Sequence, residues 1–281
     1  MKKYYRFAGI DLEINVPEFW MYENDQYLAP FRVDSVEDPH IFRLEPVAEL
    51  LPPVGECLAN TGALRVYADG TRYVGSVERG WGHAYAQVIC HGREHQVLLK
   101  NSQFSGSLGV HTVLNILGVE HLIAMAGGFV FHCSYIQVGG KAMLFTAPSG
   151  TGKSTQAELW NRLRGAPIHN GDRSAVCWQD GQAYACGIPF AGSSQICENV
   201  TLPLGAIVYL RQAPTTRIRR LRGAECFRSL WEGCSVNIWD RADVDRISET
   251  VTQVLSSVPV FELACTPDES AILALEGVLT V

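Results

Sequence analysis

The residues best suited to chemistry form one short stretch, Ala147–Thr155, which reads APSGTGKST. It fits the phosphate-binding pattern called Walker A, with Ala147 in place of the usual first glycine. Small residues let successive backbone N–H groups curl around phosphate oxygens, and a following helix would point its positive N-terminus at the same anion. We expect Lys153 to contact the β and γ phosphates of ATP, and Ser154 to offer its hydroxyl to Mg²⁺. The residues expected to hold the nucleotide are Ser149, Gly150, Thr151, Gly152, Lys153, Ser154 and Thr155.

The sequence on either side predicts the elements that such a loop needs. An apolar strand over residues 142–146 leads into the loop, and a helix over residues 156–163 follows it. The alternative is an ordinary glycine-rich turn, which this strand–loop–helix context disfavours.

A carboxylate follows the expected helix in the segment Asn170-Gly171-Asp172-Arg173. An aspartate that leaves a strand end beside a phosphate loop can hold magnesium, or can accept a proton from the attacking nucleophile. The alternative is a plain turn residue, because Asn-Gly is a favoured turn pair. We expect Asp172 to be both a metal ligand, with Ser154, and a catalytic residue.

The rest of the chain predicts an α/β protein with a small β-rich N-terminal unit. Residues 1–105 are rich in aromatic and β-branched residues, with a hairpin turn at Asp69-Gly70, and residues 106–281 form a second domain. A helix is expected over 108–126. Further strands are expected over 129–138, 175–179, 182–186, 204–210 and 260–264, and helices over 224–233, 244–256 and 267–275, the last with Thr266 as its N-cap.

Composition limits the class of protein. The 281 residues include 47% hydrophobic and 19% charged residues with a net charge of −6, which is a soluble globular balance and disfavours nucleic-acid and membrane partners. The longest apolar run, Leu122–Phe131, is too short to span a bilayer, and we expect a cytoplasmic protein. The nine cysteines form no C-x-x-C pair and are expected to be reduced. His91 and His95 have helical metal-ligand spacing, but the surrounding strands argue against that reading.

Over residues 105–281 the sequence resembles the HPr kinase/phosphorylase and phosphoenolpyruvate carboxykinase superfamily, in its short HPr-kinase-like branch. The resemblance implies a P-loop kinase core with a mixed sheet, and a histidine, His132, near the phosphates. The alternative for His132 is a histidine packed on its strand. The stretches that carry the resemblance are 131–134, 147–155, 170–175, 187–192, 258–263 and 267–271.

The sequence departs from that family at its acidic motif. The kinase/phosphorylase has two adjacent aspartates, whereas here Gly171 precedes a single Asp172. The chain also lacks the length of a carboxykinase, so carboxykinase activity is not expected. Glu198 and Asn199 are candidates for the acceptor pocket or for surface turns. A basic run at Arg217, Arg219, Arg220 and Arg222 is interpreted first as a solvated strand, and second as a phosphate or acceptor contact.

Together these features predict an ATP- and Mg²⁺-dependent kinase that transfers the γ-phosphoryl group to a hydroxyl of a protein, peptide or small molecule. Its catalytic residues would be Asp172, Lys153 and His132, and residues 1–105 would recognise the acceptor or a partner. The alternatives are a nucleotide-binding sensor without phosphotransfer, suggested by the missing aspartate, and an ordinary ATPase. The sequence leaves open a homo-oligomer.

Overall fold

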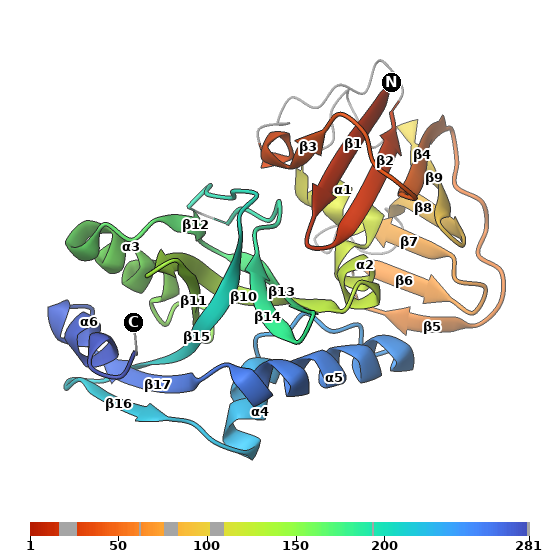
Figure 1. The fold of residues 1–281 in the computed structure, drawn as a ribbon. Helices are drawn as coiled ribbons and strands as arrows, with labels where there is room; N and C mark the ends of the chain where they lie inside the picture. The colour runs from red at the N-terminus through yellow and green to blue at the C-terminus, as the bar shows by residue number, and fades with distance from the viewer. Residues whose placement is uncertain (17–26, 62, 76–83, 102–109, 193, 280–281) are drawn as a thin grey trace. The chain divides into compact units, whose positions relative to one another are not determined.

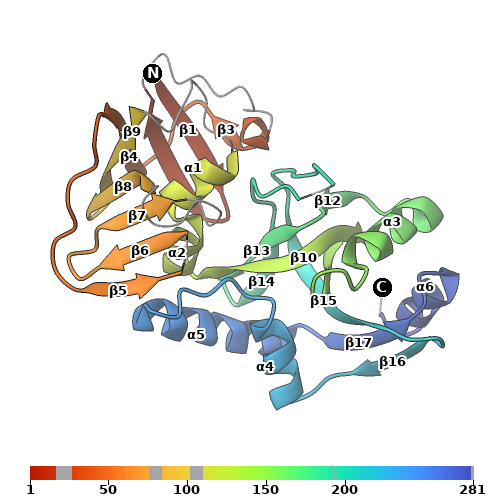
Figure 2. The same cartoon turned by 180° about the vertical axis from the view of Figure 1, so that it is seen from behind.

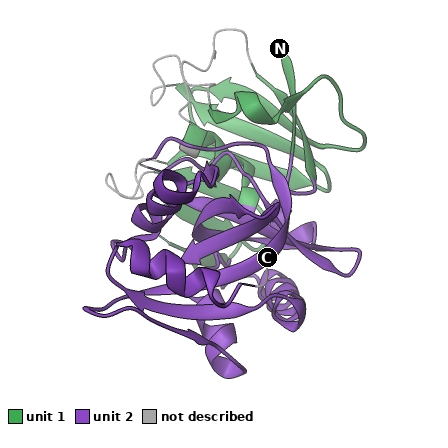
Figure 3. Cartoon of the chain, turned by 60° about the vertical axis from the view of Figure 1, so that its left-hand side comes forward, with its two compact units in different colours: residues 1–6, 10–119 green, residues 7–9, 120–281 purple. Residues whose placement is uncertain are grey.

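The computed structural model describes residues 1–16, 27–61, 63–75, 84–101, 110–192 and 194–279 (Figures 1 and 2). The chain divides into two compact units (Figure 3). Unit 1 comprises residues 1–6 and 10–119, and unit 2 comprises residues 7–9 and 120–281. The predicted domain boundary between residues 105 and 106 lies outside the described residues.

Within its described residues, unit 1 is built on a nine-stranded mixed sheet in the order β3-β1-β2-β4-β9-β8-β7-β6-β5. The pairs β2–β4 and β4–β9 are parallel, and the pairs from β9 to β5 are antiparallel. The strands are β1 Lys2–Phe7, β2 Ile10–Asn15, β3 Arg32–Val33, β4 His40–Val47, β5 Cys57–Asn60, β6 Leu64–Tyr67, β7 Arg72–Gly75, β8 Ala84–His91 and β9 Glu94–Lys100. A 3-10 helix, η2 Ala29–Phe31, precedes β3.

The hairpin predicted at Asp69-Gly70 is confirmed as the β6–β7 turn. Gly70 has φ +82°, and the Asp69 carboxylate accepts a hydrogen bond of 2.9 Å from the Thr71 amide; both features are common in short turns. His91 ends β8 and His95 lies on β9, so these two histidines do not share a helix face. His95 is buried, and its Nε2 lies 3.2 Å from Nδ1 of His40.

Unit 2 is organised by two long strands, β10 (Gly128–Val138) and β15 (Thr201–Gln212). The first half of β10 pairs with β13 and its second half with β11, while β15 pairs in turn with β14, β11 and β17. Because β13 also pairs with β14, the strands β10, β13, β14, β15 and β11 close a ring. The other strands are β11 Lys141–Thr146, β12 Ile168–Asn170, β13 Arg173–Gln179, β14 Gln182–Cys186, β16 Arg217–Arg220 and β17 Val260–Cys265.

The helices of unit 2 cover two separate apolar clusters. Alternate side chains of β11 face opposite ways: Met143 and Phe145 pack in a cluster with α3 and α6, whereas Ala142 and Leu144 pack in another with α4 and α5. β11 and β15 lie side by side as parallel strands, so helices must bury both faces of this part of the sheet. These helices are α3 Lys153–Arg164, α4 Ala224–Trp231, α5 Arg241–Ser257 and α6 Glu269–Glu276.

Most predicted elements are confirmed, but two helix predictions were wrong in detail. The described part of the helix expected over 108–126 is two helices, α1 (Val110–Leu117) and α2 (Val119–Met125), because Gly118 between them has φ +66°. Helix α6 is capped by Asp268, whose carboxylate accepts from the Ser270 amide at 2.9 Å. Thr266 is not the N-cap, because its hydroxyl donates to that same carboxylate.

The predicted basic strand exists as β16, but it ends at Arg220 and leaves Arg222 outside. Arg219 pairs with Glu262 at 2.8 Å and with Glu225 at 2.9 Å. In the part of the chain that the structure describes, no helix has the length and apolar character needed to cross a membrane.

Candidate functional site

The loop singled out in the sequence lies between β11 and α3, as predicted. Gly150 has φ +77°, and Gly152, the residue that precedes α3, has φ +114°. A Cβ at either position would meet nothing within 4 Å, so the backbone conformation is what requires glycine there. The N-cap residue of α3, Gly152, has no side chain that could accept hydrogen bonds from the first amides of the helix. Its first amides are therefore left to a ligand or to water.

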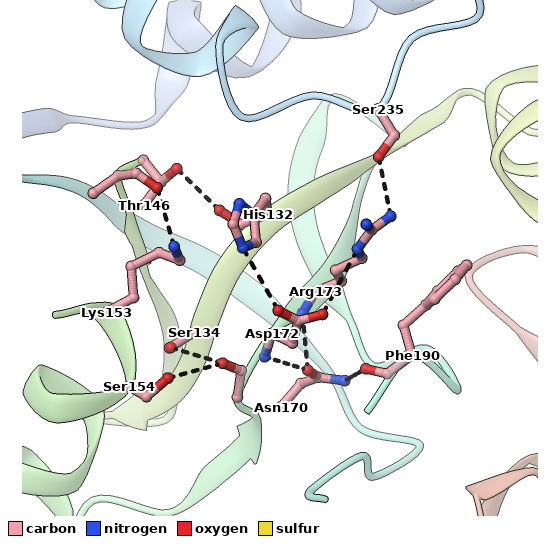
Figure 4. A network of polar contacts seen from close by, with 12 residues as sticks. His132, Ser134, Thr146, Lys153, Ser154, Asn170, Asp172, Arg173, Phe190 and Ser235 are labelled. Carbon is pink, nitrogen blue, oxygen red and sulfur yellow. Dashed lines mark hydrogen bonds and ion pairs between the residues drawn. The ribbon is translucent and has the colours of Figure 1, made fainter. Parts of the chain in front are cut away.

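Lys153 begins α3 and is almost fully buried, with 7% of its surface exposed. Its Nζ donates a hydrogen bond of 3.0 Å to the carbonyl of Ala147, at the other end of the loop (Figure 4). Burial lowers the pKa of Lys153, and the carboxylate of Asp172 acts against that shift. An ammonium group has three donors, so donors remain beyond the contact with Ala147.

Asn170 builds the turn that carries Asp172. Its Oδ1 accepts from the amides of Asp172 at 2.9 Å and Arg173 at 3.0 Å, and the side chain is fully buried. Its Nδ2 donates to the carbonyls of Ile188 at 3.2 Å and Phe190 at 3.0 Å. Asn170 therefore forms the turn and ties it to the 187–192 loop, which frees the Asp172 carboxylate for other partners (Figure 4).

The Asp172 carboxylate lies between the imidazole of His132 and the guanidinium of Arg173. Its Oδ1 is 3.5 Å from His132 Nε2, and its Oδ2 is 3.7 Å from Arg173 Nε. The pKa of Asp172 is below its ordinary value, chiefly because of the hydrogen bond with His132; the charges of Arg173 and Lys153 act in the same direction, and burial opposes them. A carboxyl group shifted this way stabilises the fold above its ordinary pKa of about 4, and the contribution is lost as the pH falls through the folded-state pKa.

Gly171 connects this turn to α3 and packs closely against Ser194. Its carbonyl accepts hydrogen bonds from Ser134 Oγ at 3.1 Å and from Ser154 Oγ at 3.3 Å. A Cβ on Gly171 would lie 2.6 Å from Cβ of Ser194, closer than real atoms approach. A side chain at position 171 would therefore require Ser194 to move, and Asp172 is the acidic group that this turn presents.

Arg173 was not singled out by the sequence, yet it extends the cluster. Its Nη1 lies 3.7 Å from Glu120 Oε1 on α2 and 3.5 Å from Ser235 Oγ. Its guanidinium also lies over the ring of Phe190, 5.2 Å from the ring centroid. The one available signal was its position directly after Asp172.

Glu198, one candidate for the acceptor pocket, has a different partner. Its Oε2 lies 2.7 Å from Nδ1 of His169, which also contacts Gln137 at 3.1 Å. His169 lies in the middle of β12 and Glu198 in the segment before β15, and their contact forms a hydrogen-bonded pair of its own, apart from the partners of Asp172.

Hollows adjoin the loop where β15 ends. One, of about 440 Å³, is lined by residues 148–151 and 209–212. Another, of about 490 Å³, is lined by residues 150–152, by Thr155 and Gln156 of α3, by the end of β15 with the two residues after it (210–214), and by the end of β17 with the two residues after it (265–267). The loop is thus bordered by space that a ligand larger than a phosphate could enter.

Comparison with known proteins identifies no family for this chain. No family model matches the chain, and no curated protein matches it. Among solved structures, the HPr(Ser) kinase/phosphatase from Coxiella burnetii is similar, with a TM-score of 0.32 and 10% sequence identity over 53% of this chain and 94% of that chain. A similarity this weak does not indicate a function, and the function proposed below is inferred from the site itself.

Gly192 sets the position of the Asp172 side chain, which yields a first prediction. A Cβ on Gly192 would lie 2.6 Å from Cβ and 2.8 Å from Cγ of Asp172. Gly192→Ala should displace the carboxylate from His132 and lower the rate of any reaction that uses Asp172 by about tenfold or more, as small misplacements of catalytic groups do. Steady-state ATP turnover measures this effect. Gly277→Ala is the control, because the nearest atom to its Cβ is an ordinary 3.5 Å away. Equal rates for both variants would contradict the packing argument.

Proposed function

We propose that unit 2 binds ATP with Mg²⁺ at the 147–155 loop and transfers the γ-phosphoryl group to an acceptor hydroxyl. One observation carries the proposal: the glycine-rich loop leads into α3 with the buried Lys153, and the next residue, Ser154, donates a hydrogen bond of 3.3 Å to the carbonyl of Gly171, which directly precedes Asp172. A buried cation at a glycine-rich helix N-terminus suits phosphate oxygens. A carboxylate beside it suits a metal or the attacking hydroxyl.

The residues near the loop fit a magnesium ion. Mg²⁺ takes oxygen ligands, and the Ser154 hydroxyl and the Asp172 carboxylate are both of that kind, linked through Gly171. Bound magnesium would neutralise charge on the phosphates. Lys153 and the loop amides bind and orient the phosphates. His132 orients the carboxylate of Asp172, which draws the proton from the acceptor hydroxyl as the phosphoryl group leaves ATP.

A sensor that binds nucleotide without transfer is the second candidate. It is favoured by Gly171, which packs closely against Ser194 and leaves Asp172 as the single carboxylate of this turn. We rank it below the kinase because phosphoryl transfer depends mainly on positioning and charge stabilisation, so a single carboxylate can suffice.

Purified protein with Mg²⁺ and γ-labelled ATP separates the candidates. We expect slow hydrolysis that accelerates when a hydroxyl acceptor is added, with the label recovered on that acceptor as a phosphate ester. Candidate acceptors are serine-containing peptides and small alcohols; recognition of the acceptor by unit 1 is part of the proposal. Tight ATP binding with neither hydrolysis nor transfer would favour the sensor, and fast hydrolysis without an acceptor would favour an ATPase.

A further inference from the structure

The hollow of about 490 Å³ lies at the ends of strands β15 and β17 in unit 2. β11, β15 and β17 are parallel neighbours, with Thr146 opposite Tyr209 and Gln212 opposite Cys265. Their carboxyl ends therefore lie at one edge of the sheet, where the phosphate loop also begins. Ligands of open α/β sheets bind outside the carboxyl ends of their strands.

The hollow is continuous with the loop. Gln212, at the end of β15, donates from Nε2 to the carbonyls of Gly150 and Thr151, at 3.4 Å each. The same two loop residues line the hollow. If the phosphates of a molecule bound to the loop, the rest of that molecule would therefore lie in the hollow.

The walls suit a flat, largely apolar ring. Leu210, Ala213, Pro214, Cys265 and Pro267 contribute apolar surface. The nearby charge of Arg211 is already paired, since its Nε lies 2.6 Å from Glu262 Oε2. Ligand pockets combine such surfaces with a few polar groups that fix orientation.

The side chain of Gln156 has an oxygen atom that can accept a further hydrogen bond. It lies in the first turns of α3, lines the hollow and is 3% exposed. Its Nε2 donates to Cys265 Sγ at 3.3 Å, whereas its Oε1 is buried with no hydrogen-bond partner among the described residues. Buried polar atoms are rarely left unpaired, and those that are call for an explanation. A carbonyl oxygen accepts hydrogen bonds, so the missing partner is a donor.

We propose that this hollow is the nucleoside subsite of the phosphate loop and that Gln156 Oε1 accepts a hydrogen bond from the exocyclic amine of adenine. The inference rests on the proposed function, because it takes the loop to hold the phosphates of a nucleotide. Hypoxanthine, the base of ITP, has a carbonyl oxygen in place of that amine. The oxygen would face Oε1, so ITP is bound more weakly than ATP.

Competition binding by the full chain, with Mg²⁺ present, tests the subsite against ATP, ITP and inorganic tripolyphosphate. We expect ATP to bind about tenfold or more tightly than ITP, as the loss of a buried hydrogen bond implies. Gln156→Leu should bring ATP and ITP to similar affinities and leave tripolyphosphate binding unchanged. Gln253→Leu on α5 is the matched control, and it should keep the preference for ATP.

The binding results distinguish failure of the nucleoside subsite from failure of the proposed function. If wild-type protein binds ATP, ITP and tripolyphosphate equally, the phosphate loop stands and the nucleoside subsite is overturned. If it binds none of them, the proposed function fails and the subsite falls with it. Because the ATP–ITP comparison needs only wild-type protein, the inference stays testable even if Gln156→Leu does not fold.

Discussion

Lys153→Ala should weaken ATP binding by at least about 10²-fold while the chain stays folded. Its ammonium group is buried under the loop, and a neutral side chain cannot replace charge-assisted bonds to two phosphates, each worth about 1.5–3 kcal/mol. The fold should tolerate the change, because burial already disfavours the charged form of this lysine. What is lost is therefore ligand binding and not the structure of α3.

Titration calorimetry with ATP and Mg²⁺ measures the affinity, and circular dichroism reports the fold. Lys141→Ala is the matched control, because Lys141 is an exposed lysine at the far end of the same strand, β11. It should bind ATP like the wild-type protein. Unchanged ATP affinity in a folded Lys153→Ala variant would remove the assignment of the 147–155 loop.

Asp172→Asn should retain nucleotide binding but lower turnover by at least about 10²-fold, the low end of what a positioned acid–base group contributes. The substitution keeps the shape of the side chain and its place beside His132, and removes the charge. Binding persists because the loop amides and Lys153 remain. His132 holds the pKa of Asp172 below its ordinary value, so the wild-type carboxylate is ionised throughout the neutral range, and this comparison is best made near pH 7.

Single-turnover transfer after rapid mixing isolates the step that Asp172 serves. Asp180→Asn is the control, because Asp180 is an exposed residue in the β13–β14 turn with φ +50°, a conformation that asparagine tolerates. A near wild-type rate for Asp172→Asn would refute the assignment and favour His132 as the working group. Gly171→Asp should not rescue Asp172→Asn, since a side chain at position 171 collides with Ser194.

The sequence alone predicted the loop and the elements beside it because those features are local. An apolar run of strand length, glycines at positions with positive φ, and a helix directly after them are properties of consecutive residues. The strand and helix that flank the loop are confirmed. The binding roles of its residues, the cofactors and the acceptor stay predictions.

The N-cap of α6 and the break between α1 and α2 were predicted wrongly because nearby residues gave equally good signals. Thr266 and Asp268 are both good N-cap residues, and sequence patterns do not decide between caps two residues apart. Gly118 lies inside a helical pattern, and only its left-handed φ shows that one helix ends there and another begins.

The tertiary structure decided which polar groups meet. His132 and Asp172 come together because β10 and β13 pair antiparallel with His132 opposite Arg173, a register that no local pattern contains. Packing against Ser194 leaves no room for a side chain at position 171, and where α3 meets the end of β17, Gln156 Oε1 has no hydrogen-bond partner among the described residues. The physical reason is that a residue's conformation depends on its neighbours in sequence, whereas its burial, charge partners and unpaired atoms depend on neighbours in space.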